Sequence, residues 1–269
     1  MKITKVSSVV VNAEMRNWVF CRVQTDVPGL IGWGEASLEW KTRAVVGAIE
    51  DLAEMIIGED PRRIEHLYQV MYRQSFWRMG VIGMSAISGI EQALWDIRGK
   101  ELNQPVYQLL GGRVRDRVRM YTHLGGGQMK AVYETFDVGP LVDLAQAVIA
   151  DGYTAIKVVF VPYSEPLEGV RTIKRFAALF ERLRAAVGDE IDIMVDFHGR
   201  TYPAMAIQYI NAIEPYRPYF CEEPCPPETW APTLEVRQQT RVPIAIGERL
   251  VGRAQFVPYF ESRACHVIQ

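Results

Sequence analysis

The chain has 269 residues, enough for one large domain or two smaller ones, and is 49% hydrophobic and 23% charged. Its net charge of −2 gives no electrostatic basis for binding nucleic acid or an anionic membrane. The amino terminus has no signal-peptide pattern, no apolar run is long enough to cross a bilayer, and the four scattered cysteines fit reduced thiols. We therefore expect a cytoplasmic protein without nucleic-acid or membrane partners.

The first part of the chain, residues 1–113, has the pattern of an α+β domain. Alternating apolar and polar residues predict three strands, and helical spacing of apolar residues then predicts three helices. The predicted strands cover 3–14, 18–26 and 28–37, and the predicted helices cover 43–58, 61–77 and 84–102. Gly58 is expected to end the first helix and Pro61 to begin the second.

The pattern changes in residues 114–269, where apolar strands alternate with amphipathic helices. Such an alternation predicts a parallel sheet covered by helices. The predicted strands cover 117–127, 155–160, 191–197, 219–224, 242–248 and 266–269. Five strand–helix units and the beginning of a sixth do not close an eight-stranded barrel, so we expect the protein to continue beyond Gln269. An open doubly wound sheet is the alternative, but no glycine-rich nucleotide motif follows any strand.

Acidic residues recur at the ends of three successive predicted strands. Asp196, Glu222 and Glu248 follow one another at intervals of 26 residues, about one strand–helix unit each. At the carboxyl ends of adjacent parallel strands their carboxylates would converge, and without a cation they would repel one another. A hard divalent cation with oxygen ligands is the natural partner, and Mg²⁺ is the default because it leaves room for water and substrate.

Several motifs in the same order resemble the enolase superfamily. They are "SAISGIEQALWDIRGK", "PVYQLLGG", "DFHGR", "CEEP" and "GER". Together they resemble the mandelate racemase/muconate lactonizing branch, and within it the acid-sugar dehydratases of the galactonate and mannonate type. The resemblance implies a capping domain over residues 1–113, a modified TIM-type (β/α) barrel over 114–269, incomplete in this chain, and one Mg²⁺ on Asp196, Glu222 and Glu248.

His198 lies two residues after Asp196 in "IMVDFHGR". Because side chains alternate along a strand, the two are expected to project from the same face at its end. In sites of the kind that the family uses, the substrate carboxylate binds Mg²⁺ while the α-proton is removed. A histidine there can protonate the departing β-hydroxyl, which makes the reaction a dehydration.

The resemblance has one departure from the family pattern. Many relatives carry Lys-x-Lys on the second barrel strand, whereas "AIKVVF" keeps Lys157 and has Val159 at the second position. This change argues against symmetric racemisation through that lysine. Lys157 could position the substrate carboxylate or only neutralise nearby acids.

Three further residues are candidate substrate contacts. Arg200 and Arg249 follow predicted site residues and could pair with sugar hydroxyls, with the acids, or with helix starts. Asn17, in the turn between the first two strands, could belong to a loop that covers the substrate or be a simple turn residue.

The leading interpretation is a Mg²⁺-dependent dehydratase that converts a sugar acid into a 2-keto-3-deoxy acid. Alternatives are an epimerase, racemase or cycloisomerase of a related carboxylate, or a catalytically inactive paralogue that binds a sugar acid. The resemblance also implies a homo-oligomer.

Overall fold

The computed structural model of the chain describes residues 1–124, 139–159, 161 and 164–269. The chain divides into two compact units, Met1–Arg117 and Val118–Gln269. Residues 125–127 of the first predicted barrel strand, and Phe160 of the second, lie outside the described residues. Among the described helices, none combines the length and the apolarity that crossing a membrane requires.

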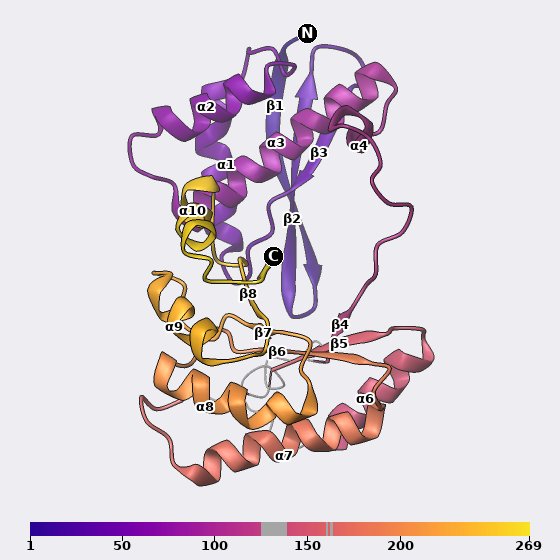
Figure 1. The fold of residues 1–269 in the computed structure, drawn as a ribbon. Helices are drawn as coiled ribbons and strands as arrows, with labels where there is room; N and C mark the ends of the chain where they lie inside the picture. The colour runs from indigo at the N-terminus through magenta and orange to yellow at the C-terminus, as the bar shows by residue number, and fades with distance from the viewer. Residues whose placement is uncertain (125–138, 160, 162–163) are drawn as a thin grey trace. The chain divides into compact units, whose positions relative to one another are not determined.

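The first unit is an antiparallel sheet with helices, in agreement with the predicted α+β pattern. The strands β1 (Ile3–Ala13), β2 (Arg16–Thr25) and β3 (Ile31–Glu35) pair in the order β1-β2-β3. The helices are α1 (Thr42–Ile56), α2 (Ile64–Gln74), α3 (Gly80–Leu102) and the short α4 (Val106–Leu109). One apolar core joins α1, α2 and α3 to the sheet. Figure 1 shows where these elements lie in the first unit.

Two glycines let strand β3 pack directly on helix α3. A Cβ atom on Gly32 would lie 2.0 Å from the carbonyl oxygen of Ala93, and one on Gly34 would lie 2.0 Å from that of Gly89. Both obstacles are backbone atoms, which cannot rotate away as a side chain can. The close approach of this strand to this helix therefore requires glycine at both positions.

We predict that Gly32→Ala lowers the free energy of unfolding by about 1–3 kcal/mol, because the strand must move away from α3. The matched control is Gly47→Ala in α1, where an added Cβ would meet nothing within 4 Å. That change should stabilise the helix by about 0.5–1 kcal/mol. Urea unfolding measures both variants, and equal effects at the two positions would contradict the packing argument.

The second unit contains a parallel sheet, as predicted. Within the described residues it has six strands in the order β4-β5-β6-β7-β8-β9, all neighbours parallel. Its elements are β4 (Thr122–His123), α6 (Gly139–Ala150), β5 (Ala155–Val158), α7 (Val170–Val187), β6 (Asp192–Asp196), α8 (Pro203–Ile213), η1 (Glu214–Tyr216), β7 (Cys221–Glu222), α9 (Ala231–Gln239), β8 (Ile244–Ile246), α10 (Arg253–Ser262) and β9 (Val267–Ile268). This is the incomplete (β/α)-barrel fold expected from the sequence.

The two faces of this sheet have different neighbours. Ile193 and Val195 of β6 belong to the large apolar core with the helices α7 and α8, which Figure 1 shows along one side of the sheet. Met194, between them, belongs instead to a small buried cluster with Ala155 and Ala245. The alternation of side chains therefore separates a helix-covered face from an inner face.

Helix α10 is an element that the sequence reading did not specify. It has no clear apolar stripe, contains Pro258, and buries only Tyr259. Because sequence-based helix prediction relies on periodicity and treats an internal proline as a break, this segment carries no strong signal.

Candidate metal centre and active site

Three charged side chains extend the inner face of the sheet at the carboxyl ends of its strands. Lys157 follows Ala155 by two residues, Asp196 follows Met194, and Glu222 follows Phe220, so each continues the face of the small inner cluster. Asp196 and Glu222 are register partners on the neighbouring strands β6 and β7. Both carboxylates are almost fully buried, at 1% exposure.

The ammonium of Lys157 lies between these two carboxylates. Its Nζ is 2.8 Å from Glu222 Oε2, to which it donates a hydrogen bond, and 3.0 Å from Asp196 Oδ2. Burial by itself lowers the pKa of Lys157, but the two carboxylates outweigh this effect and raise the net pKa. One cation therefore already sits between the first two acids of the predicted triad.

The carboxyl groups of the three acids titrate differently. Burial raises the pKa of Asp196. The hydrogen bond with His198 and the positive charge of Lys157 together lower this pKa by more than burial raises it, so the net shift is downward. The pKa of Glu222 and that of Glu248 are both raised, by desolvation and then by the negative charge of Asp196. The negative charge of Asp196 therefore acts against ionisation of both other acids, in addition to their burial.

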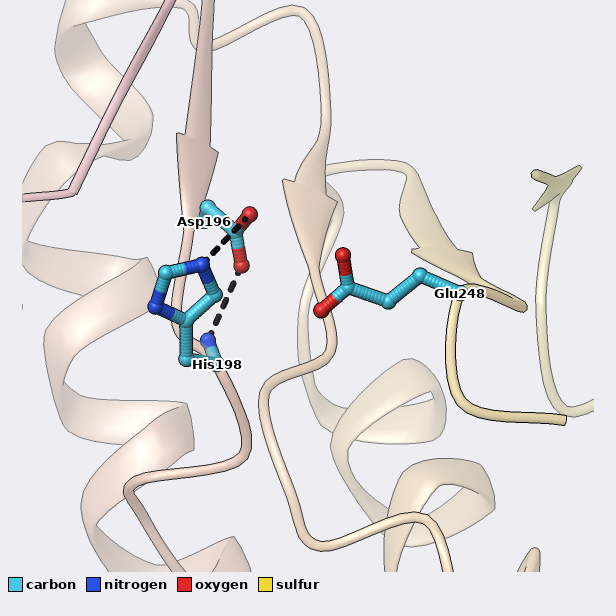
Figure 2. A group of neighbouring side chains, drawn as sticks. All are labelled: Asp196, His198 and Glu248. Atoms are coloured by element: carbon cyan, nitrogen blue, oxygen red, sulfur yellow. Dashed lines mark hydrogen bonds and ion pairs between the residues drawn. The ribbon is translucent and has the colours of Figure 1, made fainter. Parts of the chain in front are cut away.

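His198 reaches Asp196 through a turn, and the expected arrangement of both on one strand face is wrong. Strand β6 ends at Asp196, and His198 has a left-handed backbone with φ of 49°. Its backbone N–H donates to Asp196 Oδ1 at 2.9 Å, and its ring Nε2 lies 3.2 Å from Asp196 Oδ2. Figure 2 shows the ring folded back toward the carboxylate. Asp196 raises the pKa of the imidazole despite the opposing effect of burial.

Glu248 lies beyond the end of β8 and after Gly247, whose φ of 144° breaks the alternation of the strand. Among the described residues, Asp196, His198 and Glu248 each offer one ligand atom, and these atoms lie within 4.8 Å of one another. Figure 2 shows the Glu248 carboxylate directed toward the other two side chains. Glu222 is not in this group, and its Oε2 accepts hydrogen bonds from Lys157 and Gln269.

The donor atoms fit a hard divalent cation. Asp196 Oδ2 is buried and, within the described part of the chain, accepts no hydrogen bond of good geometry, although Lys157 and His198 stand close enough to neutralise its charge. A metal ion can supply the contact that such a buried carboxylate oxygen lacks. The oxygen-rich donor set suits Mg²⁺ better than a soft metal.

The candidate substrate contacts have protein partners. Arg200 donates to the carbonyl oxygen of Val161 at 2.7 Å, and Arg249 donates to Glu223 Oε2 at 2.7 Å. Asn17 lies in strand β2 of the first unit, not in the turn, and its amide donates to Thr42 Oγ1 at 3.4 Å. A sugar contact by any of the three stays a prediction.

Sequence reasoning missed two polar groups near the acids. Gln269 donates its amide to Glu222 Oε2 at 3.1 Å and to Tyr121 Oη at 3.3 Å, and the Tyr121 ring centroid is 5.9 Å from Lys157 Nζ. Gln269 follows Val267 by two residues and so continues the inner face of β9. Strand alternation at the last apolar segment was the signal that could have identified it.

Acids at the carboxyl ends of parallel strands, in a unit that follows an α+β unit, are typical of barrel enzymes that assemble their site at that end. The chain matches the mandelate racemase/muconate lactonizing enzyme N-terminal domain over residues 4–111 and the enolase C-terminal domain-like family over 140–269. It belongs to the mandelate racemase/muconate lactonizing enzyme branch of the enolase superfamily, and the resemblance drawn from its motifs is confirmed.

The chain is similar over its whole length to several proteins of this family. It is 39% identical to a D-galactonate dehydratase of Ralstonia nicotianae and covers 67% of that protein. An enolase from Pantoea ananatis, solved with bound D-gluconate and Mg, is 30% identical with a TM-score of 0.86, and the chain covers 70% of it. A mandelate racemase/muconate lactonizing enzyme from a Sulfitobacter species is 36% identical with a TM-score of 0.89 and is 71% covered.

Proposed function

We propose that the protein is a Mg²⁺-dependent dehydratase of a sugar acid. The observation that carries this proposal is the cluster of Asp196, Glu248 and His198, whose possible ligand atoms lie within 4.8 Å of one another, with Glu222 as the register partner of Asp196 on the neighbouring strand. The similarity to a D-galactonate dehydratase and to an enolase solved with D-gluconate and Mg supports an aldonate as the substrate class. The product would be a 2-keto-3-deoxy acid.

We propose Asp196, Glu222 and Glu248 as the ligands of one Mg²⁺. When bound, the ion supplies positive charge for the carboxylate of the substrate as negative charge develops on it. As a ligand, Glu222 would exchange its contact with Lys157 for a contact with the ion. In the alternative ligand group His198 replaces Glu222, and its imidazole would then bind the metal instead of acting as an acid.

His198 is the proposed general acid. Its Nε2 lies against Asp196 Oδ2, an arrangement that orients the ring. No protein partner of Nδ1 is present among the residues that the structure describes, so this nitrogen can face the substrate. A protonated imidazole there can donate its proton to the departing 3-hydroxyl, and a separate base has to remove the α-proton.

Lys157 is the second proposed catalytic residue. Its ammonium already lies between two carboxylates, so it is held at the point where a carboxylate of the substrate would approach the acids. With Glu222 and Asp196 holding the cation, the ammonium of Lys157 would pair with that substrate carboxylate and orient the sugar acid.

Incubation with a panel of sugar acids and Mg²⁺, followed by detection of 2-keto product, tests the proposed function. A 2-keto-3-deoxy product from at least one aldonate is the expected result. An epimer of the substrate without loss of water would instead identify an epimerase. Binding of a sugar acid with no product from any panel member would identify an inactive paralogue.

We predict that Lys157→Met destabilises the metal-free protein by about 3 kcal/mol, because the change leaves Asp196 and Glu222 without the ammonium. Saturating Mg²⁺ should remove most of this difference, since the ion replaces the lost charge. Urea unfolding in EDTA and in Mg²⁺ measures both effects, with the exposed Lys174→Met of α7 as the control. A destabilisation that persists unchanged in Mg²⁺ would contradict the proposed ligands.

A further inference from the structure

A second charged pair lies beside the proposed metal site and is not used by the proposed reaction. It consists of Glu223, which follows Glu222, and Arg249, which follows Glu248. Arg249 Nε donates to Glu223 Oε2 at 2.7 Å, and its Nη2 lies 2.5 Å from the same oxygen. The Glu223 side chain is 1% exposed and that of Arg249 is 43% exposed. The pair therefore joins the chain just after β7 to the chain just after β8.

The backbone of Glu223 makes the connection to the third strand end. Its N–H donates to the carbonyl oxygen of Ala245 in β8 at 2.9 Å, and its own carbonyl oxygen accepts the N–H of Gly199 at 2.7 Å. Gly199 directly follows His198, and a Cβ on Gly199 would collide with Nη2 of Arg249. Glu223 and Arg249 thus contact the turn that carries the imidazole as well as the segment that carries Glu248.

The conformation and burial of Glu223 cost the folded state free energy. Glu223 has a left-handed backbone with φ of 40°, a conformation that costs about 1–3 kcal/mol for a residue other than glycine. Its Oε1 is buried and accepts no hydrogen bond within the described part of the chain. Strained backbone and incompletely satisfied charges of this kind concentrate where a site has to be held in one geometry.

We infer that Glu223 and Arg249 are positioning residues, which lock the three strand ends so that Asp196, Glu222, Glu248 and the His198 turn keep their relative places. In this inference Arg249 acts through Glu223 and not by contact with the sugar. The inference rests on the metal site of the proposed function. Outer-shell contacts of this type contribute typically 10–100-fold to metal affinity.

Calorimetric titration with Mg²⁺ alone tests the inference in Glu223→Gln, Arg249→Gln and the double variant. By charge alone, Glu223→Gln should weaken Mg²⁺ binding, and Arg249→Gln should strengthen it. A positioning pair predicts weaker binding, by roughly 10–100-fold, in both single variants. The double variant leaves no lone buried charge, so we expect it to fold even if Arg249→Gln does not, and it should show the same loss.

Amide hydrogen exchange in metal-free protein supplies a second readout that does not depend on Mg²⁺. Exchange in residues 196–201 should become at least roughly tenfold faster in the double variant, because the ion pair no longer holds in place the backbone carbonyl of residue 223 that accepts the Gly199 N–H. The control is the double variant Arg119→Gln/Asp192→Asn, which removes an ion pair at the opposite end of β6. It should change neither Mg²⁺ affinity nor exchange in 196–201.

Opposite shifts of affinity in the two single variants would overturn the inference in favour of a simple charge effect. A lower melting temperature with unchanged affinity and unchanged exchange would overturn it in favour of a purely structural pair. If the wild-type protein does not bind Mg²⁺, the proposed metal fails, and the exchange experiment decides the inference alone. Unchanged exchange in 196–201 would then overturn it.

Discussion

Replacing His198 with Asn should lower turnover by roughly 10²–10⁴, the usual contribution of a positioned acid or base. Asn is the appropriate replacement because it tolerates the left-handed backbone that His198 adopts, so the turn is retained. Its amide cannot give a proton to the departing hydroxyl. Mg²⁺ affinity and substrate affinity should change little, since in our account neither depends on the imidazole.

Exchange of the α-proton with deuterated solvent separates the possible roles of His198. If a separate base removes that proton, exchange should continue in His198→Asn while product formation falls. Loss of exchange together with turnover would make His198 the base. Loss of Mg²⁺ binding would make it a ligand, in line with its place in the cluster with Asp196 and Glu248. The control is His66→Asn, at an exposed position in helix α2, which should leave all these quantities unchanged.

Replacing Asp196 with Asn should lower turnover by roughly 10³-fold or more, because the metal charge is worth several kcal/mol. Asp196 has two proposed roles, as a metal ligand and as the carboxylate that orients His198. The amide oxygen of Asn can still accept the backbone N–H of His198, so the turn should persist. Mg²⁺ binding measured by calorimetry should be lost.

The control for Asp196→Asn lies on the same strand. Asp192 begins β6, is partly exposed and pairs with Arg119. Asp192→Asn removes the same charge at the opposite end of the sheet and should leave turnover and Mg²⁺ affinity within about twofold of wild type, because the charge is screened and distant. Mg²⁺ binding retained in Asp196→Asn would contradict the proposed ligand set.

The fold could be predicted because its signals are local. Alternation in the first unit and the 26-residue recurrence of strand-end acids in the second both follow from how strands and helices bury one face. The 26-residue spacing predicted Asp196 and Glu222 at the ends of neighbouring strands, and the two are register partners there. Side-chain alternation alone did not predict the rest of the site. It failed for His198 and does not explain Glu248, because both follow the strand end and depend on backbone turns, one at His198 and one at Gly247.

The contacts between side chains were beyond sequence reasoning for a different reason. Lys157 could be placed at a strand end from its position, but only the register of β5, β6 and β7 puts its ammonium between two acids. The proposed positioning role of Glu223 could not be predicted from the sequence either. Alternation assigns it to the face opposite Glu222, whereas its left-handed backbone allows it to pair with Arg249.

A crystal structure of the protein grown with Mg²⁺ and an aldonate tests the central claim most directly. Our account predicts one ion bound by one oxygen from each of Asp196, Glu222 and Glu248, at about 2.0–2.4 Å. It also predicts that Glu222 has left Lys157 and that His198 faces the 3-hydroxyl of the aldonate. An ion held by Asp196, His198 and Glu248, with Glu222 still on Lys157, would contradict the account.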